Sequence, residues 1–163
     1  MDRPTFNICH ANGKGTGTAM KVELHPAEGI AEGSVVISLV RQTSVATMEG
    51  CKLIYPTFGW GDRISVKLNP VDVERVLEVF AGETEAINDG KGLFHTRADG
   101  TTAAFKLRHH IDPVPCYLLT IEKTENDETD QRNIALSPTE AGMLYHGLVA
   151  SMGMLMFGGQ GWR

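Results

Sequence analysis

The stretch Asn133-Ile-Ala-Leu-Ser137-Pro-Thr-Glu140 decides the fold, because it places a strand-like segment directly before the start of a helix. Ser137 is a short polar N-cap, Pro138 occupies the first helical position, where its missing N–H is harmless, and Glu140 completes a capping box. A polar N-cap, a proline and an acid at the positive end of a helix stand in the same order earlier, in Ile64-Ser-Val-Lys-Leu-Asn69-Pro-Val-Asp72. The chain therefore contains two units in which strands precede one helix, and this predicts an internal repeat.

Period-two alternation and β-branched runs predict four strands before the first helix. The expected strands are 18–25, 34–42, 53–55 and 63–68. The helix is expected from Pro70 to about Ala81, with Gly82 as its C-terminal cap. Residues 1–16 are polar and dotted with glycine, so they are expected to form a flexible arm.

The second half of the chain predicts the same order of elements. The expected strands are 93–97, 102–109, 117–123 and 132–136. Asp99-Gly100 marks a hairpin turn, a helix runs from Pro138 to about Phe157, and the glycine-rich residues 158–163 are expected to be a flexible tail. The order ββββα-ββββα predicts an α+β fold with antiparallel sheets. We expect one domain over 1–157, with repeat 1 at about 17–82 and repeat 2 at about 92–157.

Composition bounds the class of protein. A chain of 163 residues can bury a core without disulfides, and an odd number of cysteines, three, indicates a reducing compartment. No stretch is apolar and long enough for a membrane span, so a cytoplasmic protein is expected. The net charge of −5 argues mildly against a nucleic-acid partner. However, residues 91–123 hold five Lys or Arg against three acids, which predicts a locally positive sheet face.

The sequence shows no catalytic constellation, so we expect no enzyme, no metal and no cofactor. The glycine-rich residues 13–17 precede a strand, whereas a P-loop follows a strand and opens a helix. Adjacent histidines such as His109 and His110 point to opposite faces of a strand and cannot chelate together. A nuclease that uses His95 or His109 with a metal remains a minor alternative.

Basic and aromatic residues on the predicted strands suggest a different activity, because single-stranded nucleic acid is held by cations for its phosphates and by flat side chains for its bases. The candidate phosphate-binding residues are Lys14, Lys21, Arg41, Lys52, Arg63, Lys67, Arg97, Lys106 and Arg108. The candidate stacking residues are Tyr55, Phe58 and Trp60. Each set also has a purely structural interpretation: the cations can be an ordinary solvated strand face, and the aromatic loop can pack on a sheet edge.

The segment Ile134-Ala-Leu-Ser-Pro-Thr-Glu-Ala-Gly142 resembles the strand-to-helix junction of the Whirly family of plant single-stranded DNA-binding proteins. More distantly, Lys14-Gly15-Thr-Gly-Thr-Ala-Met20 is similar to that family's Lys-Gly-Lys-Ala-Ala-Leu motif. The positive cofactor four coactivators share a single related unit. The resemblance implies two antiparallel four-stranded sheets packed across each other with helices at the rear. It also implies tetramers with DNA lying along the sheets between subunits.

The leading hypothesis is a non-enzymatic single-stranded DNA-binding protein, largely indifferent to sequence, that acts in DNA replication, recombination, repair or transcription. We expect a homo-oligomer, either a dimer or a tetramer, and no membrane partner. Two alternatives stay open. One is an RNA-binding regulator on the same scaffold, because a stacking platform does not by itself choose between sugars. The other is an oligomeric structural or protein-interaction module, which the acidic net charge would suit.

Overall fold

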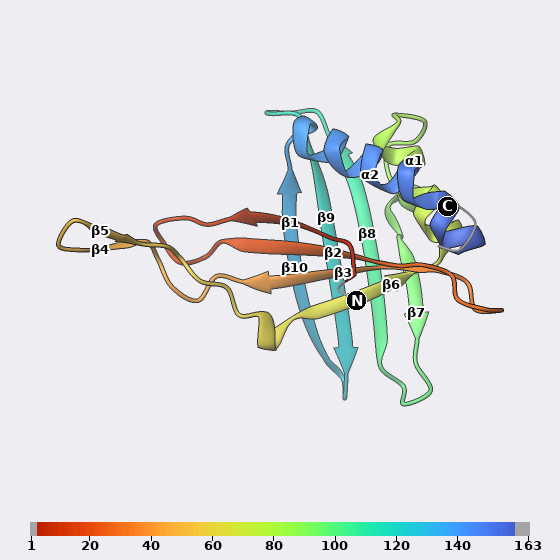
Figure 1. Ribbon diagram of the computed structural model, residues 1–163, viewed down its shortest axis with the longest axis horizontal. Helices are drawn as coiled ribbons and strands as arrows, with labels where there is room; N and C mark the ends of the chain where they lie inside the picture. Colours follow the sequence, from red (N-terminus) through yellow and green to blue (C-terminus); the bar gives the residue numbers. More distant parts are fainter. Residues whose placement is uncertain (1–2, 159–163) are drawn as a thin grey trace.

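The computed structural model describes residues 3–158, which form two four-stranded antiparallel sheets, two α-helices and a separate hairpin (Figure 1). Sheet 1 has the strand order β1-β2-β3-β6, and sheet 2 has the order β10-β9-β8-β7. The strands of sheet 1 are β1 (Thr5–His10), β2 (Thr18–His25), β3 (Ser34–Arg41) and β6 (Ile64–Leu68). The strands of sheet 2 are β7 (Leu93–Thr96), β8 (Thr102–His110), β9 (Cys116–Glu125) and β10 (Glu128–Leu136).

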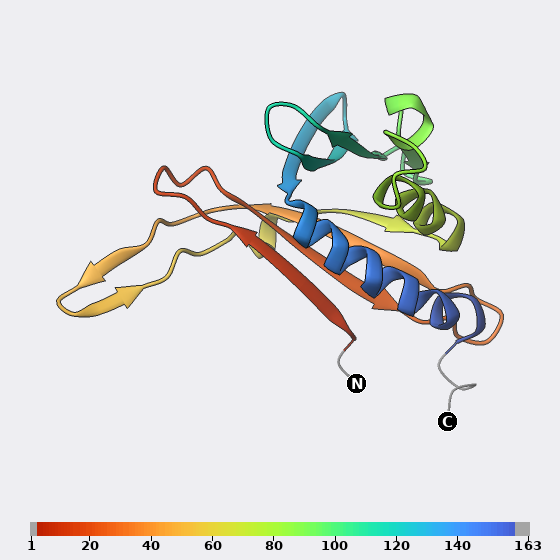
Figure 2. The same ribbon diagram turned by 90° about the horizontal axis from the view of Figure 1, so that it is seen from above.

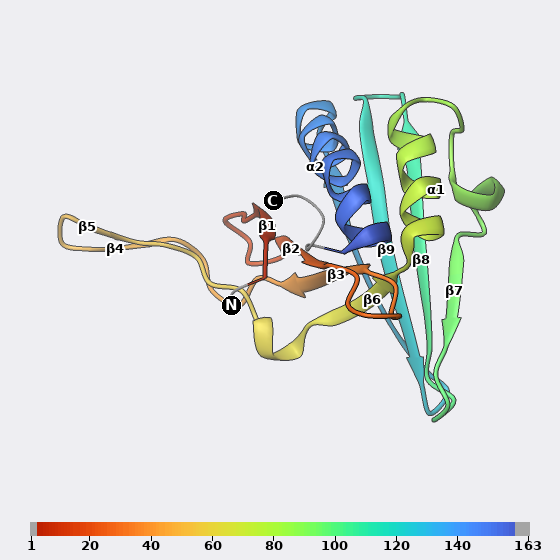
Figure 3. The same cartoon turned by 45° about the vertical axis from the view of Figure 1, so that its right-hand side comes forward.

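Each sheet is followed along the chain by one helix, α1 (Pro70–Phe80) after sheet 1 and α2 (Pro138–Phe157) after sheet 2. The predicted α+β class with antiparallel sheets and two helices is confirmed. The two sheets cross, with β10 against β2 and β3 and with β6 against β8 and β9. The two helices pack on each other and lie on the same side of sheet 2 (Figures 2 and 3). The internal repeat itself stays a prediction.

One hydrophobic core joins both sheets and both helices. It contains the inner faces of the central strands, with Ile37 and Leu39 from sheet 1 and Leu119 and Ile121 from sheet 2 all at 0% exposure. Val73, Val76 and Leu77 of α1 and Ala141, Leu144 and Leu148 of α2 complete the cluster. Because both sheets and both helices share this cluster, the core covers the inner face of each sheet. The outer face of each sheet is the one that other molecules can reach.

Both helix starts have the caps that the sequence predicts. The Asn69 side chain accepts a hydrogen bond from the Asp72 amide at 2.8 Å, and the Asp72 carboxylate accepts one from the Asn69 amide at 3.2 Å. Ser137 and Glu140 make the same reciprocal pair at 3.2 and 2.8 Å. The predicted N-caps Asn69 and Ser137 and the capping box at Ser137 are therefore confirmed, and the structure adds a second capping box at Asn69. Each N-cap contributes about 1 kcal/mol to helix stability.

The prediction of an arm over 1–16 is wrong for residues 5–10, which form β1 and pair with β2 along its full length. β1 is an edge strand in which only Ile8 is buried, so its polar residues read as loop in the sequence. The first unit of the fold thus begins at Thr5 rather than near 17. The predicted tail falls largely on residues 159–163, which lie outside the described residues, while the Gly158 amide caps α2 by donating to the Met154 carbonyl.

The predicted strand 53–55 is not part of sheet 1. Its first two residues fall in β5 (Lys52–Ile54), which pairs only with β4 (Thr47–Glu49). This hairpin extends away from the rest of the molecule (Figures 1 and 2). None of its strand residues is buried, so no apolar face ties it to the core. We call residues 47–55 the hairpin arm.

A buried arginine joins the two sheets where they cross. Arg132 of β10 is 4% exposed and donates to the Leu39 carbonyl of β3 at 3.2 Å. It also donates to the Asp62 carbonyl and carboxylate, which belong to the short 3-10 helix η1 (Trp60–Asp62), and to the Asp130 carboxylate at 2.7 Å. The Arg132 hydrogen bond holds the pKa of Asp130 below its usual range. This junction fixes how sheet 1 crosses sheet 2.

Replacing Arg132 with alanine should lower the free energy of unfolding by about 3 kcal/mol, because a buried carbonyl and two carboxylates lose their donor. Urea denaturation at neutral pH measures the change. Arg41→Ala is the matched control, since Arg41 contacts the same Asp130 at 2.7 Å from an exposed position. Its loss should cost below about 1 kcal/mol. Equal effects of the two variants would contradict a junction centred on Arg132.

Candidate nucleic-acid interface

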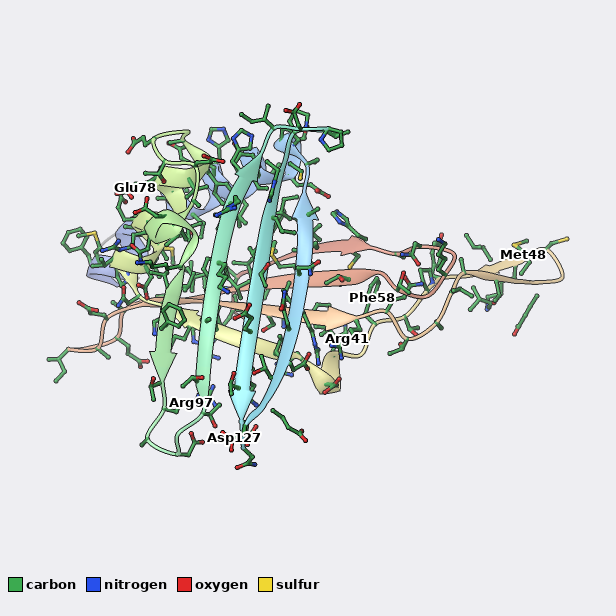
Figure 4. The ribbon with its side chains drawn as sticks, turned by 180° about the vertical axis from the view of Figure 1, so that it is seen from behind. Arg41, Met48, Phe58, Glu78, Arg97 and Asp127 are labelled. Atoms are coloured by element: carbon green, nitrogen blue, oxygen red, sulfur yellow. The ribbon has the colours of Figure 1, made fainter. Side chains whose placement is uncertain are left out.

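The outer face of sheet 2 is an open platform, which we call face 2. Figure 4 looks onto it, and no helix of residues 3–158 crosses it there. One cross-strand row on this face joins Lys106, Thr120 and Asn133, and the next joins Ala104, Glu122 and Gln131. Phe94 of the edge strand β7 pairs with Ala104 and is 67% exposed. Face 2 thus offers an aromatic ring, a cation and several neutral hydrogen-bonding side chains.

The two predicted cations on face 2 are in different surroundings. Lys106 forms an ion pair with Glu122, with 2.9 Å between Nζ and Oε1, so its charge is partly compensated. Arg108 lies at the edge of the face, where its guanidinium group sits against Gly90 of the 3-10 helix η2 (Ile87–Gly90). There it lines a hollow of about 710 Å³ together with Arg75 and three acids, Glu78, Glu85 and Asp89. The hollow carries both signs of charge and does not form a cationic track.

The outer face of sheet 1, which we call face 1, carries Lys21 and Lys67. Lys21 Nζ lies 3.2 Å from Glu23 Oε1 on the same strand. Lys67 is exposed, and no acid among residues 3–158 lies within 4 Å of its ammonium group. Burial lowers the pKa of the neighbouring His25, and the charges of Arg3 and Lys67 lower it further. Ala19 and Val40 have 0% exposure, so face 1 is open only in part.

A cleft of about 270 Å³ lies in the corner where the edge strand β6 crosses sheet 2. We call it the corner cleft. It is lined by Ser65, Val66, Lys67, His95, Arg97, Thr101, Ala103 and Lys123. The structure therefore brings together two of the predicted cations, Lys67 and Arg97, which are 30 positions apart in the sequence. Lys123 is a third cation at this place, and its part in the site was not predicted from the sequence.

The loop that carries Lys14 is held by a buried glutamine. Gln42 is 6% exposed, and its Oε1 accepts hydrogen bonds from the amides of Asn12 at 2.9 Å and Gly17 at 3.1 Å. Its Nε2 donates to the carbonyls of Asn12 and Ser44 at 2.9 and 2.8 Å. The Lys14 amide in turn donates to the Asn12 side chain at 3.0 Å. Residues 11–17 thus form an ordered loop that presents the exposed Lys14.

The three predicted stacking residues do not form one platform. Tyr55 directly follows β5, at the last position of the hairpin arm, and is 73% exposed, whereas Phe58 and Trp60 are partly buried. Arg63 donates to the Trp60 carbonyl at 3.2 Å, so these two do lie together as expected. Among the described residues, no ring of the three stacks on another. Phe94, which was not among the predicted site residues, is the aromatic residue on an open sheet face.

The nine predicted cations fall into two groups by their partners. Lys21, Arg41 and Lys106 are each within 4 Å of an acid. For the other six, no acid in the described part of the chain is that close. These six are Lys14, Lys52, Arg63, Lys67, Arg97 and Arg108. They stand at several separate places on the molecule, and the largest grouping is at the corner cleft.

Solved structures with a similar chain trace include WHY1 from Arabidopsis thaliana, at 13% identity and a TM-score of 0.71 over 93% of this chain and 86% of that one. The plant transcriptional regulator PBF-2 gives 13% identity and a TM-score of 0.74 over 95% and 83%. The chain has a Whirly-like fold. No protein-family model matches the sequence, and no curated protein matches it either.

This chain is also similar to a chain of a guide-RNA-binding protein complex solved with its guide RNA. That chain is 22% identical, with a TM-score of 0.62 over 92% of this chain and 90% of that one. The structural likeness to the Whirly proteins therefore confirms the resemblance that the strand-to-helix junction indicated. At these identities the comparisons establish the arrangement of the chain and leave its activity to be argued from its own residues.

Negative charge is concentrated on the helix side of this Whirly-like fold. Residues 70–90, which include α1 and η2, carry six acids and one arginine. Their net charge equals the formal net charge of the whole chain, −5, so the remaining residues are balanced. The acidic total, which argued against a nucleic-acid partner, therefore does not describe the sheets. Acids also stand elsewhere, with Glu122 on face 2 and four acids within residues 125–130 at the β9–β10 end of sheet 2, so the excess of negative charge lies in residues 70–90 although the acids are not confined there.

Two further properties concern other classes of function. Within residues 3–158, no three His, Cys, Asp or Glu side chains come together in a way that could hold a metal ion. His95 instead lies 3.4 Å from Asp72 at the start of α1. No helix in that range is both long and apolar enough to cross a membrane.

Substituting Gln42 with alanine should lower the free energy of unfolding by about 2 kcal/mol, because the buried amide of Gly17 and the partly buried amide of Asn12 lose their acceptor. Amide hydrogen exchange at Asn12 and Gly17 should become faster at the same time. Gln131→Ala, at an exposed position of β10, is the control and should change stability by less than about 0.5 kcal/mol. Unchanged exchange in the Gln42 variant would show that the loop is held by different contacts.

Proposed function

We propose that this protein binds single-stranded DNA without enzymatic activity and with little dependence on sequence. The observation that carries the proposal is the open face 2, where the exposed Phe94 stands beside a sheet surface with Lys106 and neutral polar groups. The net charge of −5 within residues 70–90, which leaves the rest of the chain balanced, supports it. The protein would act in the cytoplasm, in DNA replication, recombination, repair or transcription.

The chemistry of face 2 suits unpaired bases rather than a particular sequence. Stacking of a base on an aromatic ring contributes about 1–3 kcal/mol and tolerates every base, since each has a flat π face. The exposed Gln131 and Asn133 offer both donors and acceptors to base edges. Such side chains can reorient to serve different bases. The binding surface is therefore expected to accept any sequence that is single-stranded.

Besides Lys106, phosphate neutralisation would come from cations that lie outside face 2. Lys67 and Arg97 have no acid within 4 Å in the described residues, so their charge is available to a phosphate. Lys14 and Lys52 stand on projections from sheet 1, where they would contact a strand only if it extended past the body of the protein. We therefore assign them a secondary role.

An RNA-binding regulator is the second candidate. The guide-RNA-binding chain is 22% identical to this one, whereas the plant proteins are 13% identical over a similar share of the chain. The open platform is compatible with either sugar. Competition between matched DNA and RNA oligomers decides between the two candidates. A preference of about tenfold or more for RNA, which is roughly 1.4 kcal/mol, would reverse our order.

Self-association is also proposed, as a homodimer or tetramer through α2. This helix buries Leu144, Leu148 and Leu155, yet Val149 and Met156 on another side are 47% and 56% exposed. A helix that is apolar all round is normally buried on all sides. A second copy of the chain that covers Val149 and Met156 would remove this apolar surface from water.

The double variant Val149→Lys, Met156→Lys should be monomeric in light scattering at a concentration where the wild type is a dimer or tetramer. Two charged lysine side chains would have to be desolvated in the same contact. The corresponding control places lysine at Val71, which is 64% exposed on α1. A wild-type protein that is monomeric across the concentration range would contradict self-association through α2.

Phe94→Ala should weaken binding of a poly-thymidine oligomer about tenfold, through loss of one stacking contact. Fluorescence anisotropy measures the affinity. Val71→Ala, which removes an exposed apolar side chain from the helix side, should leave it unchanged. Trp60→Ala should have the smaller effect of the two aromatic variants, because Trp60 is partly buried.

The same titration should show a steep dependence on salt, since each neutralised phosphate of a single strand contributes about −0.7 to the slope of log K against log salt. A flat dependence, or equal affinity for double-stranded DNA, would contradict the proposed function.

A further inference from the structure

The corner cleft is shaped by the way the two sheets cross. β6 is an edge strand that pairs only with β3, so its other side has backbone groups without a strand partner among residues 3–158. The β7–β8 and β9–β10 ends of sheet 2 extend beyond this edge (Figure 3). The cleft lies in the angle between them and is bounded by β6 on one side and by the inner surface of sheet 2 on the other.

Cations from three separate segments meet at this cleft. Lys67 comes from β6, Arg97 from the turn after β7, and Lys123 from β9. Ser65 and Thr101 add hydroxyl groups, and His95 Nε2 is buried without a hydrogen-bond partner among the described residues. No acid of the described chain lines the cleft. Like charges held this close repel each other unless an anion lies among them.

The acids at the edge of the cleft are occupied elsewhere or are exposed. Asp72 lies 3.4 Å from His95 Nε2 but serves the capping box of α1. Asp99 accepts the amide of Thr101 at 2.9 Å within its own turn. Glu125 lies 3.1 Å from Lys123 Nζ, with 57% of its side chain exposed. A phosphate at the cleft would therefore compete only with Glu125 for a cation in direct contact.

We propose that the corner cleft binds one phosphate monoester. A monoester carries about −1.5 to −2 charges at pH 7, which matches three converging cations better than the single charge of a phosphodiester. Arg97 offers a planar fork of donors to two phosphate oxygens, and the two lysines act as point charges. At about 270 Å³, the cleft is at the small end of ligand sites and suits a single compact group.

The monoester could come from two sources. One is the terminal phosphate of a bound strand, and this source rests on the proposed function. Arg97 of the cleft directly follows β7, the strand that carries Phe94 of face 2, so the end of a strand bound on face 2 would reach the cleft around this edge of sheet 2. The other source is a small free phosphate compound, which needs no nucleic acid at all.

The first experiment compares poly-thymidine oligomers that differ only at their ends. Oligomers with a 5′-phosphate, a 3′-phosphate or two hydroxyl ends are titrated by fluorescence anisotropy at fixed salt. One phosphorylated end should bind at least fivefold tighter than the hydroxyl form. Arg97→Ala should reduce this ratio to about one, whereas Lys91→Ala, an exposed lysine outside the cleft, should preserve it.

The second experiment omits nucleic acid. Inorganic phosphate is added to isotope-labelled protein, with chloride at matched ionic strength as control, and backbone amide shifts are followed. Saturable shifts at Ser65, Arg97 and Thr101 that vanish in Arg97→Ala would support the cleft. If inorganic phosphate causes these shifts but the oligomers show no preference for a phosphorylated end, the ligand of the cleft is a small free phosphate compound. If phosphate causes these shifts but the protein binds no oligomer, the proposed function is contradicted and the phosphate site at the corner cleft is still supported. Neither shifts nor an end preference would overturn the proposal.

Discussion

The buried guanidinium group of Arg132 is the interaction on which the arrangement of this molecule depends. It reaches from β10 to the Leu39 carbonyl of β3 and to Asp62 at the entrance to β6. Hydrophobic contacts are not directional, so the apolar core alone would allow the sheets to slide over each other. A buried cation has far fewer acceptable positions, because an unpaired charge inside a protein is costly. Arg132 therefore fixes the crossing, and the crossing fixes the corner cleft.

The same arrangement explains how an acidic protein can present surfaces for a polyanion. Both helices pack on one side of sheet 2, and the acids of α1 and η2 are placed there with them. Face 2 lies on the other side of that sheet, and the corner cleft opens beside β6. Because charges beyond about 8–10 Å are largely screened at physiological salt, the local balance of each surface matters more than the sum over the chain.

Much of the fold could be predicted because its signals are local. The N-caps Asn69 and Ser137 and the hairpin turn at Asp99-Gly100 each depend on a few neighbouring residues. β1 was missed because an edge strand with one buried residue lacks an apolar face. The strand at 53–55 was assigned to the wrong sheet, since local pattern predicts an extended conformation and says nothing of its partner. Phe94 was missed as a site residue for the same reason, because its exposure depends on the edge position of β7.

The sequence by itself determined where the two helices begin, most of the strands and the α+β class, since these follow from periodicity and from capping chemistry within one segment. The tertiary structure alone decided which cations share a surface. Lys67, Arg97 and Lys123 are far apart along the chain, and they meet only because sheet 1 crosses sheet 2 at β6. Charge interactions depend on distance in space, and no spacing along the sequence encodes that distance until the sheets have packed.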